Sequence, residues 1–199
     1  MMYRRKLISF ALRHALAALV VVTTAHTGHA ALDLTATSEE YVGEGIIYKR
    51  LLFKDDERTV QMELPHGWTY RGGGAARLTL IPPGKGFGEA VMEVQPLPAS
   101  SAFDDVAVKA LEQQALSTVP PASEAIHVVQ TNQAPNGPGG RESFEVVVSY
   151  KALSYTFLRS TVFVNFPDCR LVLRMTAPEA EFQALNQTFR RTVQSWDSK

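Results

Sequence analysis

The carboxyl-terminal part of the chain holds the feature that most constrains its fold, three long apolar runs separated by short connections. The first run lies within residues 142–150, the second ends at Phe166, and the third follows a Pro-Asp turn and covers residues 169–175. In the first run every second residue is large and apolar, namely Phe144, Val146, Val148 and Tyr150. A period of two indicates β-strands, and three successive strands with short connections predict an antiparallel meander.

Further strand patterns precede the meander. Residues 46–53 and 59–64 flank a charged turn and predict a β-hairpin, which ends at Pro65 because proline cannot donate a ladder hydrogen bond. Shorter strands are predicted at residues 77–81, 90–95 and 125–131. Residues 31–44 are polar with scattered apolar positions, and we expect them to form a flexible lead-in.

Two segments have helical spacing instead. Residues 101–116 begin with a candidate cap, Ser101, and carry apolar residues at helical intervals. Near the carboxyl terminus Thr176 and Glu179 have the spacing of a capping box. An apolar stripe follows and predicts a helix that packs on the sheet: Phe182, Leu185, Phe189, Val193 and Trp196. Residues 45–199 are therefore predicted to form a single α+β domain, an antiparallel sheet of about six or seven strands with flanking helices.

The first thirty residues predict a secretory signal peptide. Four basic residues precede an apolar run over residues 15–22, and Gly28 and Ala30 indicate cleavage before Ala31. The apolar run is shorter than the roughly 20 residues that cross a membrane, so we expect no integral membrane span after cleavage. The predicted location is the periplasm or the exterior of the cell.

The charge balance changes once this segment is set aside. The chain has 20 Lys and Arg and 20 Asp and Glu, and four of the basic residues lie in the first thirty, which leaves 16 basic against 20 acidic residues. A mildly acidic body argues against nucleic-acid binding, since phosphate contacts need clustered Lys and Arg.

Sequence signatures of nucleotide, metal or cofactor chemistry are missing, so no cofactor is expected. Residues 84–88 (GKGFG) have the glycines of a phosphate loop, but no Ser or Thr follows the lysine and a strand comes next. His66 and His127 have no metal-ligand spacing. Cys169 is the single cysteine and alternates with Leu171 and Leu173, which indicates a buried thiol.

Loop aromatic residues are the remaining candidates for a binding site. Trp68, Tyr70 and Phe87 flank the two glycine-rich segments, 72–74 and 84–88, and function concentrates in loops held by a rigid scaffold. We therefore expect that these three residues line any ligand or partner site, although packing in the core explains them as well.

Two short motifs resemble the PsbP-like α/β/α sandwich family, which includes an extrinsic subunit of photosystem II and a Ran-binding import factor. Residues 60–68 (VQMELPHGW) resemble that family's strand with a P-x-G-W turn, and residues 189–196 (FRRTVQSW) resemble its closing helix. The resemblance spans about residues 45–197. It implies the sandwich fold and a binding or assembly role more often than catalysis, and it transfers no functional residue to this chain.

The favoured function is thus an exported, soluble, non-catalytic protein that binds an envelope partner or a small ligand, or assists assembly. The alternative is a hydrolase or metal-dependent enzyme with a site built from His66, His127 and Cys169, because the members of such a site meet only in space. A purely structural envelope component is a third reading.

Overall fold

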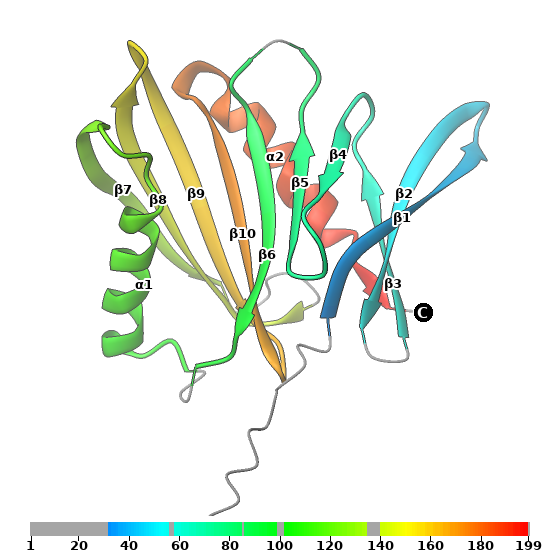
Figure 1. The fold of residues 1–199 in the computed structure, drawn as a ribbon, viewed down its shortest axis with the longest axis horizontal. Helices are drawn as coiled ribbons and strands as arrows, with labels where there is room; N and C mark the ends of the chain where they lie inside the picture. Colours follow the sequence, from blue (N-terminus) through cyan, green and yellow to red (C-terminus); the bar gives the residue numbers. More distant parts are fainter. Residues whose placement is uncertain (1–31, 56–57, 85, 99–101, 135–139, 199) are drawn as a thin grey trace, which may run out of the picture.

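The computed structural model describes residues 32–55, 58–84, 86–98, 102–134 and 140–198, and the predicted signal peptide lies outside them. These residues form two antiparallel sheets and two helices (Figure 1). The larger sheet has the spatial order β4 (Thr69–Gly72), β5 (Arg77–Ile81), β6 (Glu89–Pro96), β10 (Cys169–Pro178), β9 (Tyr155–Asn165), β8 (Ser143–Ala152) and β7 (Glu124–Ala134). The smaller sheet has the order β1 (Leu32–Gly43), β2 (Ile46–Asp55), β3 (Arg58–Leu64) and β11 (Asp197–Ser198).

The predicted meander is confirmed, because β8, β9 and β10 are successive neighbours in the larger sheet. On its other side β10 pairs with β6, with Leu173 opposite Met92. The predicted hairpin is also confirmed as β2 and β3, with Leu51 opposite Met62. It belongs to the smaller sheet, which the sequence pattern did not separate from the larger one.

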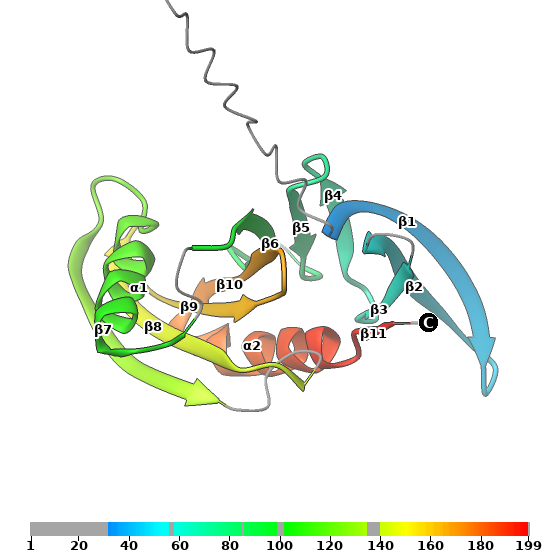
Figure 2. The same ribbon diagram turned by 90° about the horizontal axis from the view of Figure 1, so that it is seen from below.

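The helices cover opposite faces of the larger sheet (Figures 1 and 2). Helix α1 (Asp105–Ser117) packs on β7 and β8, whereas α2 (Glu179–Gln194) packs on β9 and β10 and reaches β3. Both faces of β8 are therefore covered, and residues 143–150 are all buried, the polar ones included. The α+β class with flanking helices is as predicted.

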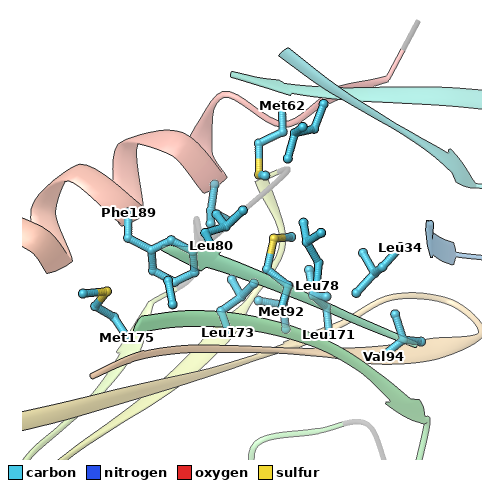
Figure 3. Close-up of a cluster of buried hydrophobic side chains, with 14 of the residues drawn as sticks. Leu34, Met62, Leu78, Leu80, Met92, Val94, Leu171, Leu173, Met175 and Phe189 are labelled. Carbon is cyan, nitrogen blue, oxygen red and sulfur yellow. The ribbon is translucent and has the colours of Figure 1, made fainter. Parts of the chain in front are cut away.

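The main core fills the space between α2, the smaller sheet and one face of the larger sheet. Figure 3 shows Phe189 from α2 and Met62 from β3 directed toward side chains of the large sheet, among them Leu80, Met92, Leu171 and Leu173. The predicted helix stripe is confirmed, since Phe182, Phe189 and Val193 are buried in this core while Leu185 and Trp196 pack partly buried against it. A smaller core lies under α1, where Leu111 and Ala115 meet the outer face of β8 and β9.

The expected flexible lead-in is wrong. Residues 32–43 form strand β1, which pairs with β2 along its length. Leu32 and Leu34 are buried in the main core, and the Leu34 amide donates to the Ala75 carbonyl at 2.7 Å. The strand was not evident in the sequence because its distal half lies outside the core and carries exposed polar residues, which removes the alternation that marks a half-buried strand.

Both predicted helix caps need correction. Helix α1 begins at Asp105, and the Asp104 carboxylate accepts hydrogen bonds from the amides of Val106 and Ala107; Ser101 lies outside the described residues. Thr176 does not cap α2, because it is still part of β10 and its hydroxyl accepts a hydrogen bond from Arg159. Strand pairing continues to Pro178, so the capping box cannot form.

Candidate functional site

A cavity of about 510 Å³ opens at the end of the larger sheet drawn uppermost in Figure 1, between β6, β8, β9, β10 and the connection from α1 to β7. We call it the Arg159 cavity. Its volume falls in the range of small-molecule sites, about 300–1,000 Å³. The lining residues are Phe87, Glu89, Pro120, Pro121, Ala122, Tyr150, Ala152, Leu153, Phe157, Arg159 and Thr176.

Aromatic side chains form one wall of the Arg159 cavity. The Phe87 ring lies 5.6 Å from Tyr155 and 6.1 Å from Phe157, and Tyr150 stacks on Phe157 at 5.5 Å. Phe87 and Tyr155 are each 51% exposed, so this cluster presents apolar surface at the cavity mouth. Exposed aromatic surface of this kind commonly marks a contact site.

Two glycines fix the position of Phe87. A Cβ on Gly88 would lie 3.0 Å from Leu185 Cδ1 of α2, and one on Gly86 would lie 3.0 Å from Glu181 Oε2. The absence of these Cβ atoms lets the segment between β5 and β6 pack closely on α2. The glycine-rich segment that resembles a phosphate loop in sequence therefore packs on α2 and positions Phe87 at the cavity.

Arg159 supplies the positive charge of the cavity, and its hydrogen-bond acceptors are neutral oxygens. Its Nε donates to Thr176 Oγ1 at 2.9 Å, and its Nη1 donates to the carbonyl and the hydroxyl of Thr118. Nη2 has only a long contact of 3.4 Å with the Tyr150 hydroxyl. In the part of the chain that the structure describes, no carboxylate lies within ion-pair distance of this guanidinium.

Burial disfavours the charged forms of both Arg159 and Tyr150. Desolvation lowers the pKa of the Arg159 guanidinium, and attraction to Glu89 on the cavity rim opposes this effect to a smaller extent. Arginine nevertheless stays protonated in proteins. Burial also raises the pKa of the Tyr150 hydroxyl, so Tyr150 is neutral at physiological pH. Tyr150 therefore provides no counter-charge to the guanidinium, and Glu89 attracts it only from the cavity rim.

Strained backbone surrounds the cavity. Of five non-glycine residues with positive φ in the described chain, three lie in the two turns at this end of the sheet: Ala122 (65°), Leu153 (52°) and Ser154 (67°). A fourth, Ala125 (51°), lies at the start of β7, where the strand register shifts. Such conformations cost about 1–3 kcal/mol each and cluster at functional sites. A second, more polar hollow of about 540 Å³ adjoins the first and shares Ala122, Ala152 and Leu153 with it.

The three aromatic residues predicted from the sequence do not meet at this cavity. Phe87 lines it, but Trp68 is buried in the main core with 7% of its surface exposed. Tyr70 of β4 packs partly buried against the same core. Trp68 and Tyr70 thus lie among core side chains, which corresponds to the packing alternative given for them above.

The alternative enzyme site is not assembled either. The strand registers place His127 of β7 at the same height in the sheet as Ala177 of β10. His127 therefore lies three strands away from Cys169 and is offset from it by eight residues along the strand direction. At about 3.3 Å per residue the offset along the strands alone is about 26 Å. His66 lies in the exposed turn after β3. Within the described residues, no three His, Cys, Asp or Glu side chains gather as a metal site.

A buried ion pair and a small cavity lie under α2, and the sequence patterns do not predict them. The buried Glu145 carboxylate accepts hydrogen bonds from the Ser160 hydroxyl at 2.6 Å and from Arg190 of α2. The adjacent cavity has a volume of only about 100 Å³. This space suits a few waters rather than an organic ligand, and the ion pair serves to join α2 to the sheet.

Comparisons with known proteins identify the architecture. No protein-family model matches the sequence, and no curated protein is significantly similar to it. The solution structure of cyanobacterial PsbP from Synechocystis is similar with a TM-score of 0.52 and 9% identity, over 90% of this chain and 99% of that chain. At this identity the likeness concerns the fold alone.

Two further structures are similar at lower TM-scores. One is a Pseudomonas aeruginosa protein of unknown function (TM-score 0.43, 11% identity, 79% of this chain and 94% of that chain). The other is LpqN, described as involved in cell envelope biogenesis of Mycobacterium tuberculosis (TM-score 0.42, 13% identity, 83% and 91%).

The class defined by these observations is an α+β sandwich in which helices cover both faces of an antiparallel sheet. More particularly, the fold is PsbP-like, as the two sequence motifs predicted. Among the described residues, neither helix combines the length and the apolar character that a membrane span requires.

Proposed function

We propose that the protein is an exported, non-catalytic binding protein that takes up a small ligand in the Arg159 cavity. The observation that carries this proposal is the cavity itself, which has the volume of a ligand site and exposed aromatic rings. It also holds a guanidinium that, among the described residues, has no carboxylate within ion-pair distance. Ligand sites typically pair an apolar lining with a few polar groups that fix orientation. The amino-terminal sequence pattern supports export, and it is the basis for placing the protein in the periplasm or outside the cell.

A neutral fluorescent probe tests the binding claim. We expect N-phenyl-1-naphthylamine to bind the purified protein saturably, with a rise in emission and a Kd in the micromolar range. Phe87→Ala should weaken binding about fivefold or more, because it removes half-exposed aromatic surface from the cavity mouth. Ile47→Ala is the matched control, since Ile47 is 63% exposed but lies in the smaller sheet. The absence of saturable binding, or equal effects of the two variants, would contradict the proposal.

A partner-binding role has an observation of its own. The β1–β2 hairpin projects from the body of the molecule (Figures 1 and 2) and exposes Val42 (71%), Ile46 (48%) and Ile47 (63%) near its tip. An apolar tip of this kind favours contact with another protein. A photo-crosslinking residue at position 47 should give a discrete adduct in the producing cell that Val42→Asp abolishes, and an unchanged adduct pattern would exclude this use of the hairpin.

A further inference from the structure

We propose that the ligand of the Arg159 cavity is a flat apolar molecule with one anionic group, such as a carboxylate or sulfonate, bound by Arg159. This inference rests on the proposed function and specifies its ligand. It assigns the aromatic wall to the apolar body of the ligand and the guanidinium to the anion. Three features of the cavity support it.

The first feature is the contrast between Arg159 and two other arginines that contact the larger sheet. Arg174 of β10 makes an ion pair with Glu93 at 2.5 Å, and Arg190 of α2 pairs with the buried Glu145. Arg159 lies on the strand beside Arg174, yet its hydrogen-bond acceptors are neutral oxygens and its guanidinium lies 5.5 Å from the centre of the uncharged Tyr150 ring. A partly buried cation without a counter-charge is costly, and an anionic ligand would supply that charge.

The second feature is the donor geometry of Arg159. Two of its nitrogens are held by Thr176 and Thr118, which fixes the plane of the guanidinium. Its Nη2 has only the 3.4 Å contact with Tyr150, so this nitrogen retains capacity to donate. Because Arg159 and Tyr150 both line the cavity, a guanidinium nitrogen and a neutral phenol are available to one bound anion.

The third feature sets the position of the apolar part. Phe87 and Tyr155 are half exposed and lie within ring-contact distance of Phe157, which lines the cavity with Arg159. An aromatic or similarly flat body can therefore lie against this wall while its anionic group reaches Arg159. The Glu89 carboxylate on the rim limits the negative charge that the site accepts, which favours a single anionic group.

Two probes that differ mainly in charge test this inference. We expect 8-anilinonaphthalene-1-sulfonate, an aromatic sulfonate, to bind more tightly than neutral N-phenyl-1-naphthylamine. Arg159→Gln should weaken sulfonate binding about tenfold or more, the usual scale for a lost charged hydrogen bond, and should change neutral-probe binding less than about twofold. Glu89→Gln should strengthen sulfonate binding, since it removes a repulsive charge.

The matched control is Arg170→Gln. Arg170 is a buried arginine of the larger sheet. Like Arg159, which is partly buried, it donates through its Nε to a neutral oxygen, here that of Asn165, but it does not line the Arg159 cavity. We expect this variant to leave the ratio of the two affinities unchanged. Equal sulfonate affinity in the wild type and Arg159→Gln, with both folded by circular dichroism, would overturn the inference.

A competition experiment on the unmodified protein covers the case in which Arg159→Gln does not fold. Benzoate should displace the neutral probe at a concentration at least about tenfold lower than benzyl alcohol does, because only benzoate carries the anion. If both displace it equally, the anion claim fails while the proposed binding function stands. If neither naphthyl probe binds at all, the proposed function fails with it.

Discussion

Replacement of Trp196 by alanine tests how the carboxyl-terminal segment is held. The Trp196 indole stacks on Phe53 at a centroid distance of 5.4 Å and an angle of 10°, and it lies 6.4 Å from Phe166. Phe53 is buried in the smaller sheet and Trp196 is partly buried against the main core. The indole therefore joins the end of α2 to the hairpin of the smaller sheet.

The expected loss follows from the buried area. Aromatic side chains bury about 150–250 Å², and a partly buried tryptophan about 130 Å², which at about 25 cal/mol per Å² corresponds to about 3 kcal/mol. Residual burial in the unfolded chain reduces this to about 2 kcal/mol, and the ring stack adds about 0.5–1.5 kcal/mol. We expect Trp196→Ala to lower the free energy of unfolding by about 2.5–3.5 kcal/mol.

Urea unfolding followed by circular dichroism is the suitable assay, because the substitution removes one of only two tryptophans and would disturb fluorescence. Trp196→Phe is the control, since it keeps an aromatic ring over Phe53 and should lose less than half as much stability. A change below about 0.5 kcal/mol in Trp196→Ala, with an unchanged denaturant slope, would refute the packing described for this segment.

Three further predictions concern single sites. Burial raises the pKa of Cys169 to about 11 from the ordinary value of 9.0. At pH 8 the folded protein should therefore react with iodoacetamide about 100-fold more slowly than the unfolded chain. The stabilisation that the protonated thiol gives the folded state should decrease as the pH rises from about 9 to 11. Leu153→Asn with Ser154→Gly should stabilise the protein by about 1–2 kcal/mol in urea unfolding, because both residues have positive φ in the two-residue β8–β9 turn; no gain would argue against that turn. Asp104→Ala should cost about 1 kcal/mol in the same assay by removing the cap of α1, and an unaltered midpoint would show that the cap contributes nothing.

The elements that the sequence predicted are those with one consistently covered face or stripe. Cys169, Leu171 and Leu173 alternate in the sequence and are all buried on the α2 side of β10. Strand β1 escaped detection because only its first residues reach the core, and the apolar Val42 near its end is exposed. Separation of the strands into two sheets depends on which edges pair, and alternation within a strand carries no such information.

The candidate site was only partly visible in the sequence. The glycine-rich segment around Phe87 predicts a contribution of this residue to a binding site, whereas no sequence motif marks Arg159. Its signal was a charged residue inside an apolar strand, on the same face as Phe157 and Phe163, where a lone cation is unusual. In the structure this face of β9 meets the connection after α1 and the β8–β9 turn. Their proximity follows from the order of strands in the sheet, which the residue pattern within a single strand does not specify.

The pairing of β6 with β10 has a consequence for how the chain folds. Met92 and Leu173 are opposite each other yet lie about 80 residues apart in sequence, with α1 and three strands between them. Loop closure of this length makes the central seam of the sheet slow to form. During synthesis, β6 therefore has no permanent neighbour on this side until the whole meander has been made, and a chaperone that shields its apolar face during this interval would raise the yield of folded protein.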